Sequence, residues 1–390
     1  MNLRFTYLCR NLTRNPTRTA LTCAAIALPI VIYVLSFSVI REFDGFLEGA
    51  ARQLRLCVVQ KTSIINPLPV GHRRKIESLD PTGKRLISVC GLRWIGGKVD
   101  DHPQLLSTMA ADTDTFLDTF TDYKLSDKER ANWLRERRAI IVGSGTAEQF
   151  GWKVGDHVFI KPSLPPYGEM EFVVVAVANS ARDPVTNFFR SDYYEEEMKK
   201  LGGRSDIVSF FFVKCATKED LNNFRAKIDE LFAHTPDETK TQDEKTFMSG
   251  FITQQFNLPR NLTILAIATI FVAVMAAANT MSMNIRDRMN EIATMRSLGF
   301  GPLGVFALVQ SESLLLCVGG GILGAGLPYL AFNFTPLARM NVPLIQTLVV
   351  EPGVCVQALA IAVGVALFAA MVPAISAARI PLVTALRNQE

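Results

Sequence analysis

Four long apolar runs interrupt this sequence, and their order constrains how the chain can fold. The runs are Ala20–Ile40, Asn261–Ile285, Pro302–Ala338 and Pro352–Ala378. Each has at least about 20 residues, enough for a helix to cross a hydrocarbon layer about 30 Å thick. A long polar stretch separates the first run from the second. The sequence therefore predicts a membrane protein with four transmembrane α-helices and a large mixed α+β extracytoplasmic domain between helices 1 and 2.

The composition fits this combination of spans and one soluble domain. Charged residues make up 20% of the chain and the mean hydropathy is +0.20, which is too apolar for a soluble protein and mild for a wholly buried one. The net charge of +4 is small and the basic residues are scattered, so no nucleic-acid partner is expected. The seven cysteines form no CxxC pair, which argues against a zinc knuckle or a disulfide framework. A bond between Cys57 and Cys90 stays open if the domain is extracytoplasmic.

The distribution of arginine predicts the orientation of the chain, because short cytoplasmic segments carry an excess of Lys and Arg. Segments 1–19, 285–301 and 379–390 together hold nine arginines, and the loop 339–351 holds one. Both termini are therefore expected in the cytoplasm, with the large domain and the loop 339–351 outside, in the periplasm or the extracellular space. The first apolar run exceeds the ~7–15 residues of a signal-peptide core, so it is expected to remain as an anchor.

These expectations divide the chain into nine segments. They are a cytoplasmic amphipathic N-terminal helix (1–19), the first span (20–41), the periplasmic domain (42–257), the second span (258–285), a cytoplasmic helix (286–301), the third span (302–338), an outer loop (339–351), the fourth span (352–378) and a cytoplasmic tail (379–390). The N-terminal helix would lie on the anionic inner surface. The alternative is that the arginines of segment 1–19 only set the membrane topology.

Within the large domain, sequence patterns predict short strands and helices in two subdomains. The expected helices are 71–78, 113–120, 127–136 and 218–232, and the expected strands are 54–60, 86–89, 92–95, 139–142, 158–160, 171–177 and 206–214. Strand 171–177 is apolar almost throughout, so both of its faces are expected to be buried.

The sequence has no motif for catalysis or metal binding. The Gly-Lys pairs at Gly83 and Gly97 lack the other P-loop residues, so this chain is not expected to hydrolyse ATP. Gly143-Ser144-Gly145 lacks the frame of a nucleophile elbow. The four histidines, which have neither HxH nor HxxxH spacing, are His72, His102, His157 and His234. We therefore expect no catalytic residue, no metal site and no cofactor on this chain.

The most distinctive stretch is residues 285–300, between the second and third apolar runs. Its apolar residues at helical spacing are Ile285, Met289, Ile292 and Met295. Four charged residues on the other faces are Arg286, Arg288, Glu291 and Arg296. Gly299 suits the end of a helix. Such a helix would lie on the membrane surface or insert into a partner's groove, and the pattern leaves both readings open.

Motifs in this half of the chain resemble the FtsX/MacB-type permease subunits of type VII ABC transporters. The motifs are EIATMRSLGF at 291–300, ESLLL at 312–316, the glycines between 319 and 326, and PAISAARIPLVTALR at 373–387. The family pattern is close to R-x-x-E-I-A-x-L-R-A-L-G, so Met295 and Ser297 here replace Leu and Ala. In the large domain, residues 147–160 are similar to the periplasmic core domain of MacB and LolC-like members.

The resemblance implies a permease that works as a homodimer on a dimer of separate cytoplasmic ABC ATPases, which bind the ATP and Mg²⁺. Such permeases work by mechanotransmission, in which closure of the ATPases moves the spans and the outer domain. The implied function is export or extraction of a lipid, lipoprotein, peptide or hydrophobic small molecule. A periplasmic membrane-fusion adaptor or a lipoprotein carrier is a further candidate partner. The alternative is an FtsX-like transmitter that regulates an extracytoplasmic hydrolase without transport, but the large outer domain favours the first function.

By this match, residues 286–299 would form the coupling helix that docks on the ATPase. Its expected coupling residues are Arg286, Arg288, Glu291, Arg296 and Gly299. Glu291 and Arg296 would contact the partner or bond within the helix.

Three residues of the third apolar run are expected to have structural roles inside the membrane. Glu312 is the one acidic residue in the four runs, and a charge at depth costs at least ~2.5 kcal/mol. We expect it near the cytoplasmic surface, bonded to the coupling helix, with proton coupling as the alternative. Gly320 and Gly324 have GxxxG spacing, which lets two spans approach closely. This spacing leaves open whether the partner span belongs to the same chain or to a second copy.

Overall fold

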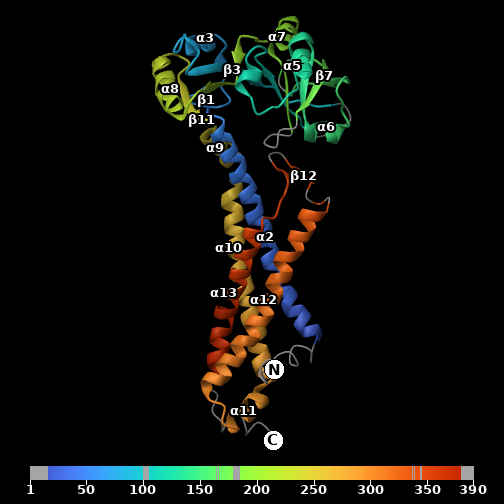
Figure 1. Cartoon of the computed structure of the whole chain (residues 1–390), viewed down its shortest axis with the longest axis vertical. Coiled ribbons are helices and arrows are strands. Elements are labelled where there is room, and N and C mark those ends of the chain that lie inside the picture. The colour runs from blue at the N-terminus through green and yellow to red at the C-terminus, as the bar shows by residue number, and fades with distance from the viewer. Residues whose placement is uncertain are drawn as a thin grey trace. The chain divides into compact units, whose positions relative to one another are not determined.

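The computed structural model describes residues 16–99, 105–163, 165, 167–178, 185–335, 337, 339–342 and 345–378. The chain divides into two compact units (Figure 1): a helical unit, Met1–Glu42 with Asn257–Met340 and Thr347–Glu390, and a sheet unit, Phe43–Phe256 with Asn341–Gln346. Of the expected N-terminal helix 1–19, residues 1–15 lie outside the described residues, and residues 16–19 belong to the first long helix. His102 and the expected tail 379–390 also lie outside the described residues.

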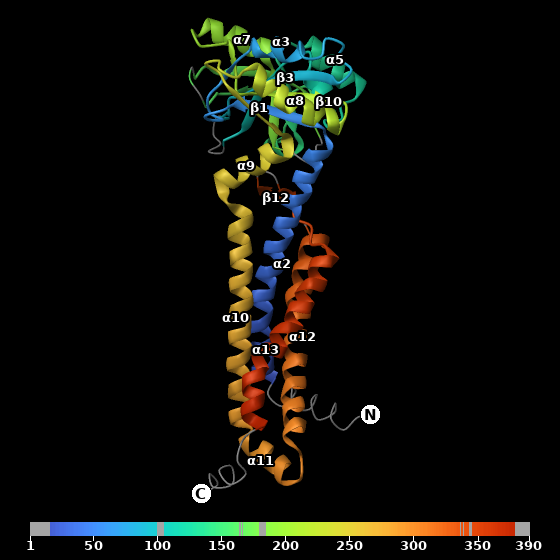
Figure 2. The same cartoon turned by 90° about the vertical axis from the view of Figure 1, so that its left-hand side faces the viewer.

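Four long helices lie side by side in the helical unit (Figures 1 and 2). They are α2 (Pro16–Arg52), α10 (Leu258–Asp287), α12 (Pro302–Phe334) and α13 (Pro352–Ala378). Each is long and apolar enough to cross a membrane, by length and composition. Between α12 and α13 in the sequence, β12 (Arg339–Val342) and β13 (Ile345–Thr347) form a two-stranded sheet. The predicted architecture of four spans with a mixed domain after the first is confirmed.

Small side chains fill the contacts between these helices. Ala273 and Ala277 of α10 and Ala358 and Ala362 of α13 are almost fully buried, whereas Phe368 of α13 is exposed. Lipid tails solvate apolar side chains as well as another helix does, so helices in a membrane associate mainly through close packing of small residues. The distribution of alanine and phenylalanine is that of a membrane bundle.

The sheet unit is built on one nine-stranded sheet with strand order β11-β1-β10-β3-β4-β8-β5-β7-β6. The strands are β1 (Arg55–Gln60), β3 (Leu86–Trp94), β4 (Ser107–Ala111), β5 (Ala139–Gly143), β6 (His157–Ile160), β7 (Met170–Ala178), β8 (Thr186–Arg190), β10 (Phe210–Cys215) and β11 (Thr239–Asp243). The short β2 (Leu68–Pro69) and β9 (Ile207–Val208) pair separately. The helices are α3 (His72–Glu77), α4 (Phe116–Thr119), α5 (Asp127–Arg135), α6 (Ser144–Phe150), α7 (Ser191–Lys200), α8 (Lys218–Leu231) and α9 (Glu244–Phe256).

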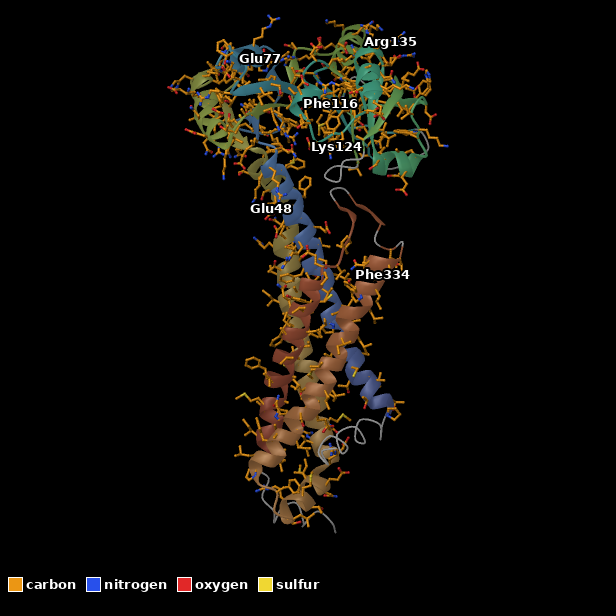
Figure 3. The ribbon with its side chains drawn as sticks, in the orientation of Figure 1. Glu48, Glu77, Phe116, Lys124, Arg135 and Phe334 are labelled. Atoms are coloured by element: carbon orange, nitrogen blue, oxygen red, sulfur yellow. The ribbon has the colours of Figure 1, made fainter. Side chains whose placement is uncertain are left out.

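Alternation along the strands buries both faces of the sheet. Leu56 of β1 packs in a cluster with Phe224 of α8, and the next residue, Cys57, packs in a cluster with Phe116 and Trp133. Successive side chains of a strand point to opposite faces, so one short apolar strand contributes side chains to the hydrophobic cores on both faces of the sheet. Figure 3 shows Phe116 inside the sheet unit, among other side chains. The expected division into two subdomains stays a prediction, since a single sheet runs through the unit.

Several boundaries in this unit differ from expectation. The two strands expected at 86–89 and 92–95 are one strand, because β3 stays paired with β10 through Gly91, which lies opposite Phe211. The strand expected at 206–214 is divided at Ser209 into β9 and β10, and the helix expected at 113–120 is only α4. The sequence patterns missed β2, β4, β8, β11 and α9.

Cys57 and Cys90 are not partners. Both pair in register with Phe212, one from β1 and the other from β3, so strand β10 lies between them. Neighbouring strands are about 4.8 Å apart, which puts the two Cα atoms about 10 Å apart, beyond the roughly 4.4–6.8 Å that a disulfide spans. Both thiols are free and buried.

Candidate functional site

The segment between the second and third spans forms a short helix at the end of the bundle. Helix α10 ends at Asp287, the backbone breaks at Arg288 (φ −113°, ψ 17°), and α11 runs over Met289–Ser297. The coupling helix is therefore shorter than expected, and Arg286 belongs to the last turn of α10. Residues 285–292 contain neither proline nor glycine, so tertiary contacts rather than local propensity set this break.

The end of α11 follows the expected glycine signal. Gly299 has φ +97°, its N–H donates to the Arg296 carbonyl, and the Phe300 N–H donates to the Met295 carbonyl, both at 3.1 Å. These two bonds are the Schellman arrangement, which favours glycine at the left-handed position. Gly301 and Pro302 then start α12.

The apolar face of α11 is buried within the chain. Ile292 packs in a small core with Ile285 of α10, Val305 of α12 and Ala377 of α13, and Met295 lies against it. Figure 2 shows α11 joining the ends of α10 and α12. The face of the helix that the sequence pattern identified is thus used to fix α11 on three spans.

A cluster of four polar residues, which we call the Arg288 cluster, lies beside this core: Asn284, Arg288, Glu291 and Glu312. Nη1 of Arg288 donates to Oε2 of Glu312 at 2.8 Å, and its Nε donates to Glu291 at 3.0 Å. Nδ2 of Asn284 donates to Oε1 of Glu312 at 2.6 Å. The side chains of Arg288 and Glu312 are only 13% and 8% exposed. Glu312 is therefore bonded to the segment that connects α10 with α11.

The Arg288 cluster has no space for a substrate. The cavity next to it, lined by residues that include Met281 and Leu308, has a volume of about 10 Å³, roughly what one water requires. Among the described residues there is no group of three or more His, Cys, Asp or Glu side chains placed to hold a metal ion. The geometry here can fix helices relative to one another and resist their separation.

Asn284 was missed by the sequence patterns. It lies four residues before Arg288, a spacing that places two helical side chains on one face. A polar amide near the end of an apolar span, one turn before an arginine, is the signal that identifies it.

The outer surface of this turn is apolar. Leu298 is 76% exposed, Leu303 is 83% exposed and Phe300 is 49% exposed. Arg296 is half-buried in the last turn of α11, and Arg286 is exposed.

Gly320 and Gly324 pack α12 against α2 of the same chain. A Cβ at Gly320 would lie 2.9 Å from Cβ of Ile26, and one at Gly324 would lie 2.7 Å from the Ala27 carbonyl oxygen. Between them in sequence, Gly321 faces Ala362 of α13. The GxxxG spacing thus serves packing within the chain at these two positions.

Comparison with known proteins bears on this part of the chain. Residues 263–382 match the family model described as "FtsX-like permease C-terminal", a range that includes the Arg288 cluster and α11. No curated protein matches the chain.

Among solved structures, the extracellular domain of the noncanonic ABC-type transporter YknZ from Gram-positive bacteria is 11% identical, with a TM-score of 0.34, over 48% of this chain and 99% of that domain. The periplasmic region of MacB from Actinobacillus actinomycetemcomitans is 10% identical, with a TM-score of 0.35, over 50% and 92% of the two chains. At such TM-scores these likenesses add nothing to the argument. The family match confirms the resemblance seen in the sequence motifs, and residues 263–382 form an FtsX-like permease C-terminal region.

Proposed function

We propose that this chain is the permease subunit of an ATP-driven ABC transporter, in which a separate cytoplasmic ATPase docks on α11 and drives the spans and the sheet unit by mechanotransmission. The observation that carries the proposal is the way α11 is held. Its own apolar core and the bond between Arg288 and Glu312 fix it to α10, α12 and α13. A force applied to α11 therefore acts on three spans at once.

The exposed apolar residues at the end of α11 support a protein partner. From Glu312 to Phe334, α12 covers about 33 Å at 1.5 Å per residue, which is already the thickness of the hydrocarbon layer. Leu303 lies about 13 Å beyond Glu312 on the same count. The irregular backbone at 298–301 also requires hydrogen-bond partners that lipid does not supply. We therefore expect a cytoplasmic protein to bind this apolar surface.

The remaining parts of the proposal follow from the arginine distribution and the family match. The chain lies in the bacterial inner membrane with both termini in the cytoplasm, and it works as a homodimer. ATP and Mg²⁺ bind to the ATPase and not to this chain. The cargo is a lipid, lipoprotein, peptide or hydrophobic small molecule, delivered with or without a periplasmic adaptor or a lipoprotein carrier.

Purification from native membranes tests the docking step. The tagged full chain is isolated in mild detergent, and co-purifying proteins are identified by mass spectrometry. We expect an ABC ATPase with the wild-type chain and its loss with Leu298→Glu plus Phe300→Glu. The matched control is Val154→Glu plus Phe159→Glu, two apolar residues of the sheet unit with 53% and 52% exposure, which is expected to keep the ATPase. Wild-type chain that carries no ATPase would refute the proposal.

A second variant tests the charged residues of α11. Charge reversal at Glu291 and Arg296 is expected to weaken ATPase association while membrane insertion remains normal. Reporter fusions test the orientation: a fusion after Lys200 is expected to be active only outside the cytoplasm, and one after Ser297 only inside. The opposite pattern would place α11 on the wrong side for an ATPase.

The signalling alternative has its own result in the same purification. An extracytoplasmic hydrolase that co-purifies with the chain and changes its activity when ATP is added would identify a transmitter. Release of labelled lipid or lipopeptide from proteoliposomes containing the complex, dependent on ATP, would identify a transporter.

A further inference from the structure

Arg288, at the start of α11, bonds to carboxylates of its own chain. Arg288 reaches Glu291 and Glu312 with two different nitrogens, and 87% of its side chain surface is covered, since 13% is exposed. A residue placed this way is poorly suited to contact another protein. Its partners lie instead on two different helices of the same chain.

The carboxylate of Glu312 is held on both of its oxygens. Asn284 of α10 bonds Oε1 at 2.6 Å and Arg288 bonds Oε2 at 2.8 Å. A bond on each oxygen restricts the side chain to one orientation, because rotation breaks one bond or the other. The three residues therefore connect α10, the α10–α11 break and α12 at one point.

The position of this point along the membrane makes its bonds costly to break. Glu312 lies about 15 Å from the start of α12 and about 33 Å from its end, so it sits where the hydrocarbon layer begins. At low dielectric the attraction of a charge pair increases, and so does the cost of leaving either charge unpaired. The apolar core under α11 has no such directional bonds, and apolar contacts tolerate sliding.

We propose that Asn284, Arg288 and Glu312 form the rigid joint through which movement of α11 reaches α10 and α12, with Arg288 as the positioning residue. This inference rests on the proposed function, since it needs a partner that moves α11. Without the joint, α11 keeps its apolar core and its exposed docking surface, but it turns independently of α12. The joint therefore separates docking of the ATPase from transmission of its movement.

The first experiment measures the joint in the full chain alone, in lipid nanodiscs. Spin labels are attached to non-natural amino acids at Thr294 of α11 and Leu314 of α12, so the native cysteines remain, and the distance distribution is recorded by pulsed electron resonance. We expect a narrow distribution for the wild type and one at least twice as wide for Arg288→Met. Arg288→Lys is expected to fall between them, because a lysine keeps the charge but not the two-sided contact.

The control removes an arginine from an ion pair elsewhere in the helical unit. Arg41 of α2 bonds Glu351 at 3.1 Å, and both side chains are about half exposed. Arg41→Met is expected to leave the distribution between Thr294 and Leu314 unchanged. Equal widths for the wild type and Arg288→Met would overturn the proposal. Equal broadening with Arg41→Met would overturn it too, because the effect would then be general loosening.

The second experiment uses the complex with its ATPase. Labels at Val272 of α10 and Leu314 of α12 report movement of the spans on addition of ATP and vanadate. In Arg288→Met we expect the ATPase to stay bound and this distance change to be lost. Full movement in the variant would overturn the joint. Absence of any ATPase in the wild-type preparation would refute the proposed function instead, and the first experiment would still decide on the joint.

Discussion

Replacing Arg55 by methionine is expected to destabilise the sheet unit strongly, because the change removes the guanidinium from the buried Glu244 and the largely buried Asp122. Arg55 begins β1 and is 1% exposed. Its Nε and Nη2 donate to Glu244 at 2.7 and 2.9 Å, its Nη1 and Nη2 donate to Asp122 at 2.6 and 3.2 Å, and Nη1 also donates to the Thr119 carbonyl at 3.3 Å. All five N–H groups that a guanidinium offers are therefore matched by a bond.

The magnitude follows from what remains after the substitution. Burial alone would lower the pKa of Arg55, but the Glu244 and Asp122 carboxylates raise it above its ordinary value, so the charged form is held firmly. Removing one partner of a buried ion pair costs about 3–5 kcal/mol, a large part of the ~5–15 kcal/mol that stabilises a domain. For a unit of this size each kcal/mol shifts the melting temperature by about 2–4 °C, which predicts a loss of about 6–20 °C.

Intrinsic fluorescence is a selective assay for this loss. All three tryptophans of the chain, Trp94, Trp133 and Trp152, lie in the sheet unit, so the thermal transition of the detergent-solubilised chain reports this unit alone. Adding Asp122→Asn and Glu244→Gln to Arg55→Met is expected to recover part of the loss, because no unpaired charge is then buried.

Two results would refute this reasoning. Arg204 forms an exposed ion pair with Asp206 at 3.2 Å, and Arg204→Met is expected to leave the transition unchanged. If Arg55→Met melts at the temperature of Arg204→Met, the buried pair does not stabilise the unit. If the triple variant melts below Arg55→Met, the penalty does not come from unpaired carboxylates.

Three further predictions concern packing, pH and thiol chemistry. Gly324→Leu is expected to destabilise the bundle by more than ~1–3 kcal/mol, because a Cβ at Gly324 would already lie 2.7 Å from a backbone oxygen. Gly326→Leu is the control, since a Cβ at Gly326 meets open space. The two variants are compared by the heat-induced loss of the monodisperse peak in size-exclusion chromatography in detergent, and equal losses would contradict the assigned contact with α2. The Thr82 hydroxyl and three backbone N–H groups, those of Thr82, Arg85 and Leu86, bond to the Asp80 carboxylate and lower its pKa. Its stabilisation is therefore present above the unfolded pKa of ~3.9 and is lost as pH falls through the folded value. Melting scans between about pH 5 and pH 2 should show a larger decrease in melting temperature for the wild type than for Asp80→Asn, and parallel curves would argue against this role. Burial raises the pKa of the Cys57 and Cys90 thiols, so neither is expected to react with maleimide before the sheet unit unfolds. Mass spectrometry of the labelled chain measures this reaction. An intact mass about 2 Da below the mass of the reduced chain would indicate a disulfide and would contradict the strand order.

The sequence was sufficient for the features that depend on short segments. The four spans follow from the transfer free energy of about 20 consecutive residues, and α11 follows from its helical spacing and from the need for glycine at φ +97°. In the sheet unit, strands with continuous apolar runs such as β5 and β7 were found, but β4, β8 and β11, which carry several polar residues, were missed. Their side chains are buried through neighbours that no local pattern reveals.

The amino-acid sequence by itself therefore determined the membrane architecture and the family motifs, and it predicted a segment for partner binding. Only the tertiary structure decided which groups meet: Glu312 with Arg288 and Asn284, Gly324 with Ala27, and Arg55 with Glu244, which lies 189 residues away. Hydropathy and helical spacing are properties of a segment in isolation. The partner of a buried charge or of a glycine in a helix contact depends on which distant segments pack together, and this is settled when the whole chain folds.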